Sequence, residues 1–151
     1  MADESGPPRL ETAGLLRRLG AMLYDGLLLV AVLMVATALF LPLTGGEAIS
    51  FDSHPVVALV YRLVLLAIVM LFFGFAWTRS GQTLGMTTWK LRVECADGRA
   101  LDWKKALLRL ACALLSLAPA GLGFLWIVVD RENLAWHDRL SGTRVVRLPA
   151  K

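Results

Sequence analysis

The chain has 151 residues, enough for one domain, and 57% of them are hydrophobic. A typical soluble domain is about 45–50% apolar, and here the excess lies in a few long runs, which favours a lipid environment over a large core. The net charge of +4 comes from Lys and Arg that flank these runs, without a nucleic-acid-binding motif, so we expect no nucleic-acid partner.

The first long apolar run covers residues 19–41 and contains a single charged residue, Asp25. It exceeds the roughly 20 residues that cross a bilayer core, so we predict a transmembrane helix that ends at Pro42. The acidic, Pro-rich residues 1–13 before it lack the basic start and short apolar stretch of a signal peptide. We expect them to form a disordered tail.

A second apolar run at 56–77 contains one charge, Arg62, and predicts a second transmembrane helix. The polar segment that follows has an alternating stretch and then Asp97-Gly98, a strong hairpin signal. We therefore predict a small β-hairpin here, and residues 143–148 form another β-prone piece that could pair with it.

A third apolar segment, at 103–129, is interrupted by Pro119, Gly121 and Gly123. Proline removes a helical hydrogen bond and clashes with the preceding turn, and each half is shorter than a full span. Two alternatives remain open, a kinked third transmembrane helix and a re-entrant pair that enters the membrane and returns.

The distribution of Lys and Arg favours the re-entrant form, because basic residues accumulate on the cytoplasmic side of a membrane. They lie before the first run, within 78–109 and in the C-terminal segment, whereas the loop at 42–55 has none. The N-terminus and the C-terminus are then both cytoplasmic. A kinked third span would place the basic C-terminal segment outside.

These elements predict an all-α membrane protein with two transmembrane helices, a broken third helical element, re-entrant or kinked, and a small cytoplasmic β-hairpin. The membrane domain covers residues 14–148, followed by a short tail at 149–151. We expect a multi-pass protein of the plasma (inner) membrane.

Asp25 is the most informative polar residue, because an ionisable side chain within a span costs about 2.5–3.5 kcal/mol at the membrane centre. Arg18, seven residues earlier, lies on the same helical face. Asp25 is either a proton or cation site or a paired residue that holds helices together.

Other polar residues in or near the apolar runs have weaker signals. Arg62 is either a snorkelling arginine or a cavity-lining one, and His137-Asp138 is either a proton shuttle or a hydrogen-bonded pair that closes the last helix. Cys95 and Cys112 lack metal-ligand or redox spacing and are expected to be free thiols. Without a catalytic or cofactor-binding motif we expect no enzyme, metal or cofactor.

Several segments in order resemble the RDD family of small integral membrane proteins, over residues 14–148. They are RLGAMLYDGLL, SGQTLGMTTWKLRV with DGRAL behind it, and GLGFLWIVVDRENLAWHDRLSGTRVV. The resemblance implies that Arg18, Asp25 and Asp138 are the family's arginine and two aspartates, with Asp130 as the other candidate for the last. It also implies a membrane-embedded protein, with transport suggested for the family and Na⁺/H⁺ exchange linked to some members.

Two functions follow as hypotheses. The first is transport of Na⁺, H⁺ or another small cation through a homo-oligomer, with Asp25 titrating and with Arg18, Asp138 and His137 in the same polar cluster. The accessory candidates are Arg62 and Asp130. The second is a non-catalytic membrane module that assembles with or regulates a larger membrane-protein partner.

Overall fold

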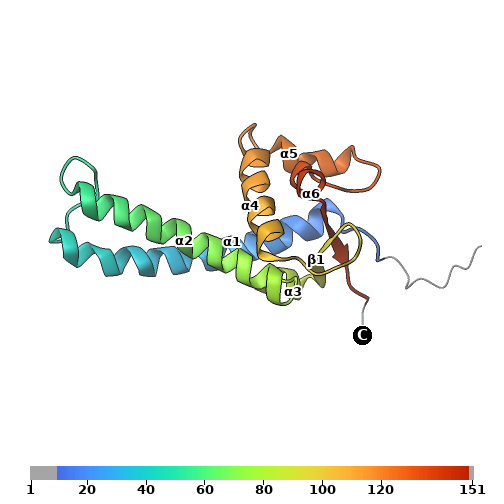
Figure 1. Cartoon of the computed structure of the whole chain (residues 1–151), viewed down its shortest axis with the longest axis horizontal. Helices are drawn as coiled ribbons and strands as arrows, with labels where there is room; N and C mark the ends of the chain where they lie inside the picture. Colours follow the sequence, from blue (N-terminus) through green and yellow to red (C-terminus); the bar gives the residue numbers. More distant parts are fainter. Residues whose placement is uncertain (1–9, 150–151) are drawn as a thin grey trace, which may run out of the picture.

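The computed structural model describes residues 10–149, and two long helices dominate it (Figure 1). Helix α1 (Leu15–Phe40) and helix α2 (Pro55–Arg79) run antiparallel and are joined through the 3-10 helix η1 (Leu41–Thr44) and a loop. All other elements gather at the end of this pair where α1 begins and α2 ends (Figure 1). We call α1, η1 and α2 the apolar arm, and we call the remaining elements, which contain both helices and strands, the head.

The two predicted long apolar helices are confirmed, and α1 with η1 and α2 are both long and apolar enough to cross a membrane. Prolines mark their boundaries, because Pro42 opens η1 and Pro55 occupies the first turn of α2, where its missing N–H costs nothing. Large apolar side chains along the arm are exposed, such as Leu39 at 73% and Val56 at 73%. An unpartnered apolar surface of this length suits a lipid solvent.

The third helical element is broken, as the sequence predicts. Helix α4 (Trp103–Leu117) is followed by α5 (Leu122–Leu125) and the 3-10 helix η2 (Trp126–Val128), and the two halves are bent by 105°. By length and composition the bent pair is either a broken span or a re-entrant loop. A Cβ at Gly123 would lie 2.6 Å from the Ser116 Cβ, so only glycine lets the returning half pack this closely on α4.

The predicted β-hairpin around Asp97-Gly98 is wrong. Strand β1 (Leu91–Cys95) pairs antiparallel with β2 (Thr143–Arg147), the distant segment that the sequence offered as an additional partner. The Asp97-Gly98 turn does form, with the Gly98 amide donating to the Cys95 carbonyl at 2.8 Å. The chain then enters α4. The Asp102 carboxylate caps this helix by accepting a hydrogen bond from the Lys105 amide at 2.7 Å, so a helix and not a second strand follows the turn.

The described part of the predicted N-terminal tail is ordered. The Ala13 amide donates to the Val145 carbonyl at 2.9 Å, and the Arg147 amide donates to the Glu11 carbonyl at 2.8 Å. Residues 11–13 therefore lie along β2, on the edge that β1 does not occupy. The disorder predicted for residues 1–13 is wrong for this part, and residues 1–9 lie outside the described range.

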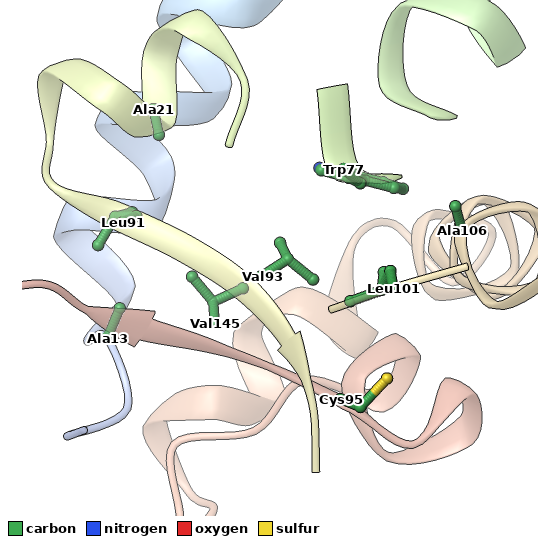
Figure 2. Packing of buried hydrophobic residues seen from close by; sticks show 9 residues of the cluster. All are labelled: Ala13, Ala21, Trp77, Leu91, Val93, Cys95, Leu101, Ala106 and Val145. Atoms are coloured by element: carbon green, nitrogen blue, oxygen red, sulfur yellow. The ribbon is translucent and has the colours of Figure 1, made fainter. Parts of the chain in front are cut away.

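The apolar core sits where this sheet meets the start of α1, the end of α2 and the start of α4 (Figure 2). Leu91 and Val93 of β1 are fully buried and belong to the same cluster as Trp77, which lies near the end of α2. Cys95 and Cys112 are both buried and free, as expected. Two short helices complete the head, α3 (Leu84–Thr88) and α6 (Trp136–Ser141).

Candidate functional site

Asp138, near the start of α6, lies at the centre of a buried ion-pair network. Its carboxylate is 0% exposed and accepts hydrogen bonds from Arg109 of α4 at 2.6 Å and from Arg18 of α1. The Ala135 amide also donates to it at 3.1 Å, so Asp138 caps its own helix. One carboxylate thus joins three helices that are far apart in the sequence.

The two arginines in this network are held by further neutral partners. Arg18 donates to the carbonyl oxygens of Ala13 at 2.9 Å and of Asn133 at 2.8 Å. Arg109 donates to the Thr143 hydroxyl at 2.5 Å. Buried charges persist in proteins when they are paired and hydrogen-bonded, and both guanidinium groups meet this condition through several bonds.

The local electrostatics keep Asp138 charged and His137 neutral. Burial alone would raise the pKa of Asp138, but the charges of Arg109 and Arg18 overcome it and hold that pKa below its ordinary value. Burial, with the nearby charge of Arg109, lowers the pKa of His137 to about 3. In this environment His137 does not titrate near neutral pH, which argues against the proton-shuttle interpretation. Its ring instead packs on Phe124, with centroids 4.6 Å apart.

Asp25 lies in a second polar site between α1 and α3. It is 4% exposed, and its carboxylate accepts a hydrogen bond from the Thr83 hydroxyl and another from the Gly85 amide at 2.8 Å. A Cβ at Gly85 would overlap the Ala21 carbonyl oxygen. Glycine is therefore required for α3 to approach α1 closely enough to bind Asp25.

The structure brings together Arg18, His137 and Asp138, with the His137 Nε2 atom 3.5 Å from the carboxylate. Asp25 makes no hydrogen bond or ion pair with any of them among residues 10–149. Arg18 and Asp25 do line the same cavity, of about 270 Å³. The proposed single polar cluster is therefore split into two sites on one cavity wall.

The accessory candidates lie elsewhere. The guanidinium of Arg62, in α2, lies over the ring of Phe51, 3.8 Å from its centroid. Phe51 belongs to the loop that joins α1 and α2. Asp130 pairs with Arg139 and accepts from the Leu134 amide at 2.9 Å. Asp138, and not Asp130, is therefore the ion-pair partner of Arg18.

The sequence analysis used Arg109 only as one of the basic residues that indicate the cytoplasmic side. In the structure it is the second ion-pair partner of Asp138. A signal was present, because Arg109 lies three residues from Ala106 and three from Cys112, on the buried face of α4. No comparable signal singles out Thr83 or the glycine two residues after it. Among residues 10–149 no group of three or more His, Cys, Asp or Glu side chains could hold a metal ion.

Two membrane-length helices with a buried Arg–Asp–Arg network at their base define a small helical membrane protein. The model of the RDD family matches residues 12–142, so the chain belongs to the RDD family. The resemblance seen in the sequence motifs is thereby confirmed. No curated protein and no solved structure matches the chain.

Proposed function

We propose that this protein transports a small cation or proton across the membrane, with Asp25 as the titrating group. The observation that carries the proposal is the different environment of the two buried aspartates. Asp138 is bound by two arginines, whereas Asp25 lines the cavity with only neutral donors around it and no ion-pair partner among residues 10–149. A carrier residue must be able to lose and regain its charge, and a carboxylate locked between two cations cannot do so.

The partners of Asp25 fit both of its charge states. A hydroxyl group donates to a carboxylate and, after rotation, accepts from a protonated carboxyl group. The Thr83 hydroxyl can therefore follow the proton on Asp25, while the Gly85 amide keeps donating to the other oxygen. Carboxylate and hydroxyl oxygens are also ligands that a hard cation such as Na⁺ accepts.

We further propose that the pathway forms in a homo-oligomer. One protomer offers two full-length apolar helices and one bent pair, which are too few to enclose a path through the bilayer. The exposed apolar faces of α1 and α2 are available for such an assembly.

For the topology we propose a cytoplasmic N-terminus, a re-entrant bent pair and a cytoplasmic C-terminus in the plasma membrane. The sheet supports this arrangement. Residues 11–13 precede the first span, β1 follows the second, and β2 follows the bent pair, yet all three lie side by side. Since hydrogen-bonded strands cannot be separated by a bilayer, this pairing supports a bent pair that enters and leaves on one side. Reporters active on only one side, fused after Lys151, test this, and an external C-terminus would contradict it.

The transport proposal is tested by flux into vesicles that contain the purified protein, measured with a pH-sensitive or Na⁺-sensitive dye. We expect flux from the native chain and its loss in Asp25→Asn, which keeps the shape of the side chain but removes its charge. Asp130→Asn is the matched control, because it changes an aspartate outside the cavity wall. If Asp25→Asn transports ions as well as the native protein does, Asp25 is not the carrier.

The second candidate function is a non-catalytic membrane module that assembles with or regulates a larger partner. The Arg18–Asp138–Arg109 network favours it, because its two ion pairs join α1, α4 and α6. Absence of flux from the native chain, together with a stoichiometric membrane-protein partner in a pull-down, would support this alternative over transport.

A further inference from the structure

Three buried nitrogen atoms around the 270 Å³ cavity find no hydrogen-bond partner among residues 10–149. They are Nε1 of Trp77, Nε of Arg109 and Nδ1 of His137. The three residues are only 5%, 3% and 5% exposed, so bulk water does not reach them freely. Unpaired buried donors are rare in folded proteins and cost about 1–3 kcal/mol each. Trp77 Nε1 and Arg109 Nε are donors, whereas His137 Nδ1 is an acceptor when the neutral ring carries its proton on Nε2, toward Asp138. Two unpaired donors around one cavity point to a ligand with oxygen acceptors.

These two donors belong to neighbouring side chains. The guanidinium carbon of Arg109 lies 5.3 Å from the centre of a Trp77 ring. One small oxygen-bearing group could therefore meet both N–H groups at once. The ion-pair network of Arg18, Arg109 and Asp138 carries one positive charge in excess, and Asp25, on the same cavity wall, makes no ion pair with this network. Asp25 offsets this excess over the wall as a whole, so the choice of ligand rests on the unpaired Nε–H of Arg109, because a donor that belongs to a cation forms its strongest hydrogen bonds with a carboxylate.

The rest of the cavity wall is apolar and leads to the lipid-facing surface. Leu19 and Met22 of α1 line it and are 42% and 43% exposed, and Leu114 and Leu117 of α4 line it and are 60% and 59% exposed. The cavity is larger than the roughly 150 Å³ apolar cavity that binds benzene in an engineered protein. It has room for one hydrocarbon chain segment.

We infer that this cavity binds a single-chain anionic lipid, a long-chain fatty acid whose carboxylate accepts hydrogen bonds from Trp77 and Arg109. The hydrocarbon tail lies along the apolar wall and leaves between α1 and α4 into the surrounding lipid. This site is separate from the hydrogen bonds of Asp25, so the inference does not rest on the transport proposal.

The test is equilibrium binding of labelled palmitate to the purified full-length protein in phosphatidylcholine nanodiscs. Native protein is expected to bind it saturably. Trp77→Phe keeps an aromatic ring but removes the N–H donor, and we expect about ten-fold weaker binding, because a hydrogen bond to a charged group is lost. The unfolding temperature should stay equal or rise, since the donor has no protein partner to lose. Trp126→Phe is the matched control, outside the cavity wall, and should bind like the native chain.

A second variant, Leu114→Trp, blocks the mouth of the cavity at an exposed position and should abolish binding without disturbing the core around Trp77. The inference is overturned if the native protein shows no saturable palmitate binding or if Trp77→Phe binds palmitate normally. It is also overturned if the uncharged methyl ester binds equally well, or if two-chain phosphatidylglycerol displaces palmitate.

Discussion

Replacing Asp138 with asparagine removes the carboxylate that pairs with two buried arginines, Arg18 and Arg109. Arg18 is 6% exposed and Arg109 3%, so neither guanidinium can find water as a substitute partner. The new amide group also directs a donor toward donors, because the aspartate accepts from both arginines and from the Ala135 amide. Removing one partner of a buried ion pair typically destabilises a protein by about 3–5 kcal/mol. That is a large part of an ordinary total of about 5–15 kcal/mol.

The loss is measured as the free energy of unfolding of detergent-solubilised protein, followed by tryptophan fluorescence during denaturant titration. Asp97→Asn is the matched control, because this aspartate is 50% exposed and pairs with Arg99, which is 82% exposed. Exposed ion pairs contribute little, so the control should change stability far less. A triple replacement of Arg18, Arg109 and Asp138 by apolar residues should recover part of the loss, because no buried charge then remains unpaired.

The reasoning is refuted if Asp138→Asn destabilises the protein by less than about 1 kcal/mol, which is the range of an exposed ion pair. Equal losses for Asp138→Asn and Asp97→Asn would have the same meaning. In either case the buried network would not hold the three helices together.

Two further predictions concern the second polar site and the pH dependence of stability. Gly85→Ala should lower the free energy of unfolding by about 1–3 kcal/mol, because its Cβ would overlap the Ala21 carbonyl oxygen. Gly14→Ala, with no atom near the added group, should not do so, and an equally tolerated Gly85→Ala would contradict the close approach of α3. Because the pKa of His137 falls from 6.5 to about 3 on folding, the unfolded chain binds one more proton between these pH values. Stability should therefore fall as the pH drops through this window, by up to about 1.4 kcal/mol per pH unit. His137→Gln should flatten the curve measured by pH-dependent unfolding, and an unchanged slope would show that another group causes it.

The membrane character of the chain could be predicted from local sequence. Length and hydropathy are sufficient to locate two spans, and the structure extends them by a few residues, to Leu15–Phe40 and Pro55–Arg79. The break at Pro119 follows from its missing amide hydrogen and its ring, which act on the neighbouring turn whatever the tertiary structure is. Arg18 and Asp25 also stand out locally, because each is a charge at or within an apolar run.

The partners of these residues depended on tertiary structure. The Asp97-Gly98 turn predicts a local hairpin, but β1 pairs instead with β2, whose Val145 and Val146 bury their side chains in the head. Local pattern reports which residues can form a strand, while the choice of neighbour depends on which apolar faces meet.

The polar sites illustrate the same limit. Asp25 binds Thr83, 58 residues away, and Asp138 binds Arg18, 120 residues away. The sequence by itself determined that these charges stand in or beside apolar segments and need partners. Only the tertiary structure decided which partners they have, and it separated Asp25 from the Arg18–Asp138 pair. The physical reason is that hydrogen bonds and ion pairs act over a few ångströms, so they depend on how distant helices pack and not on spacing along the chain.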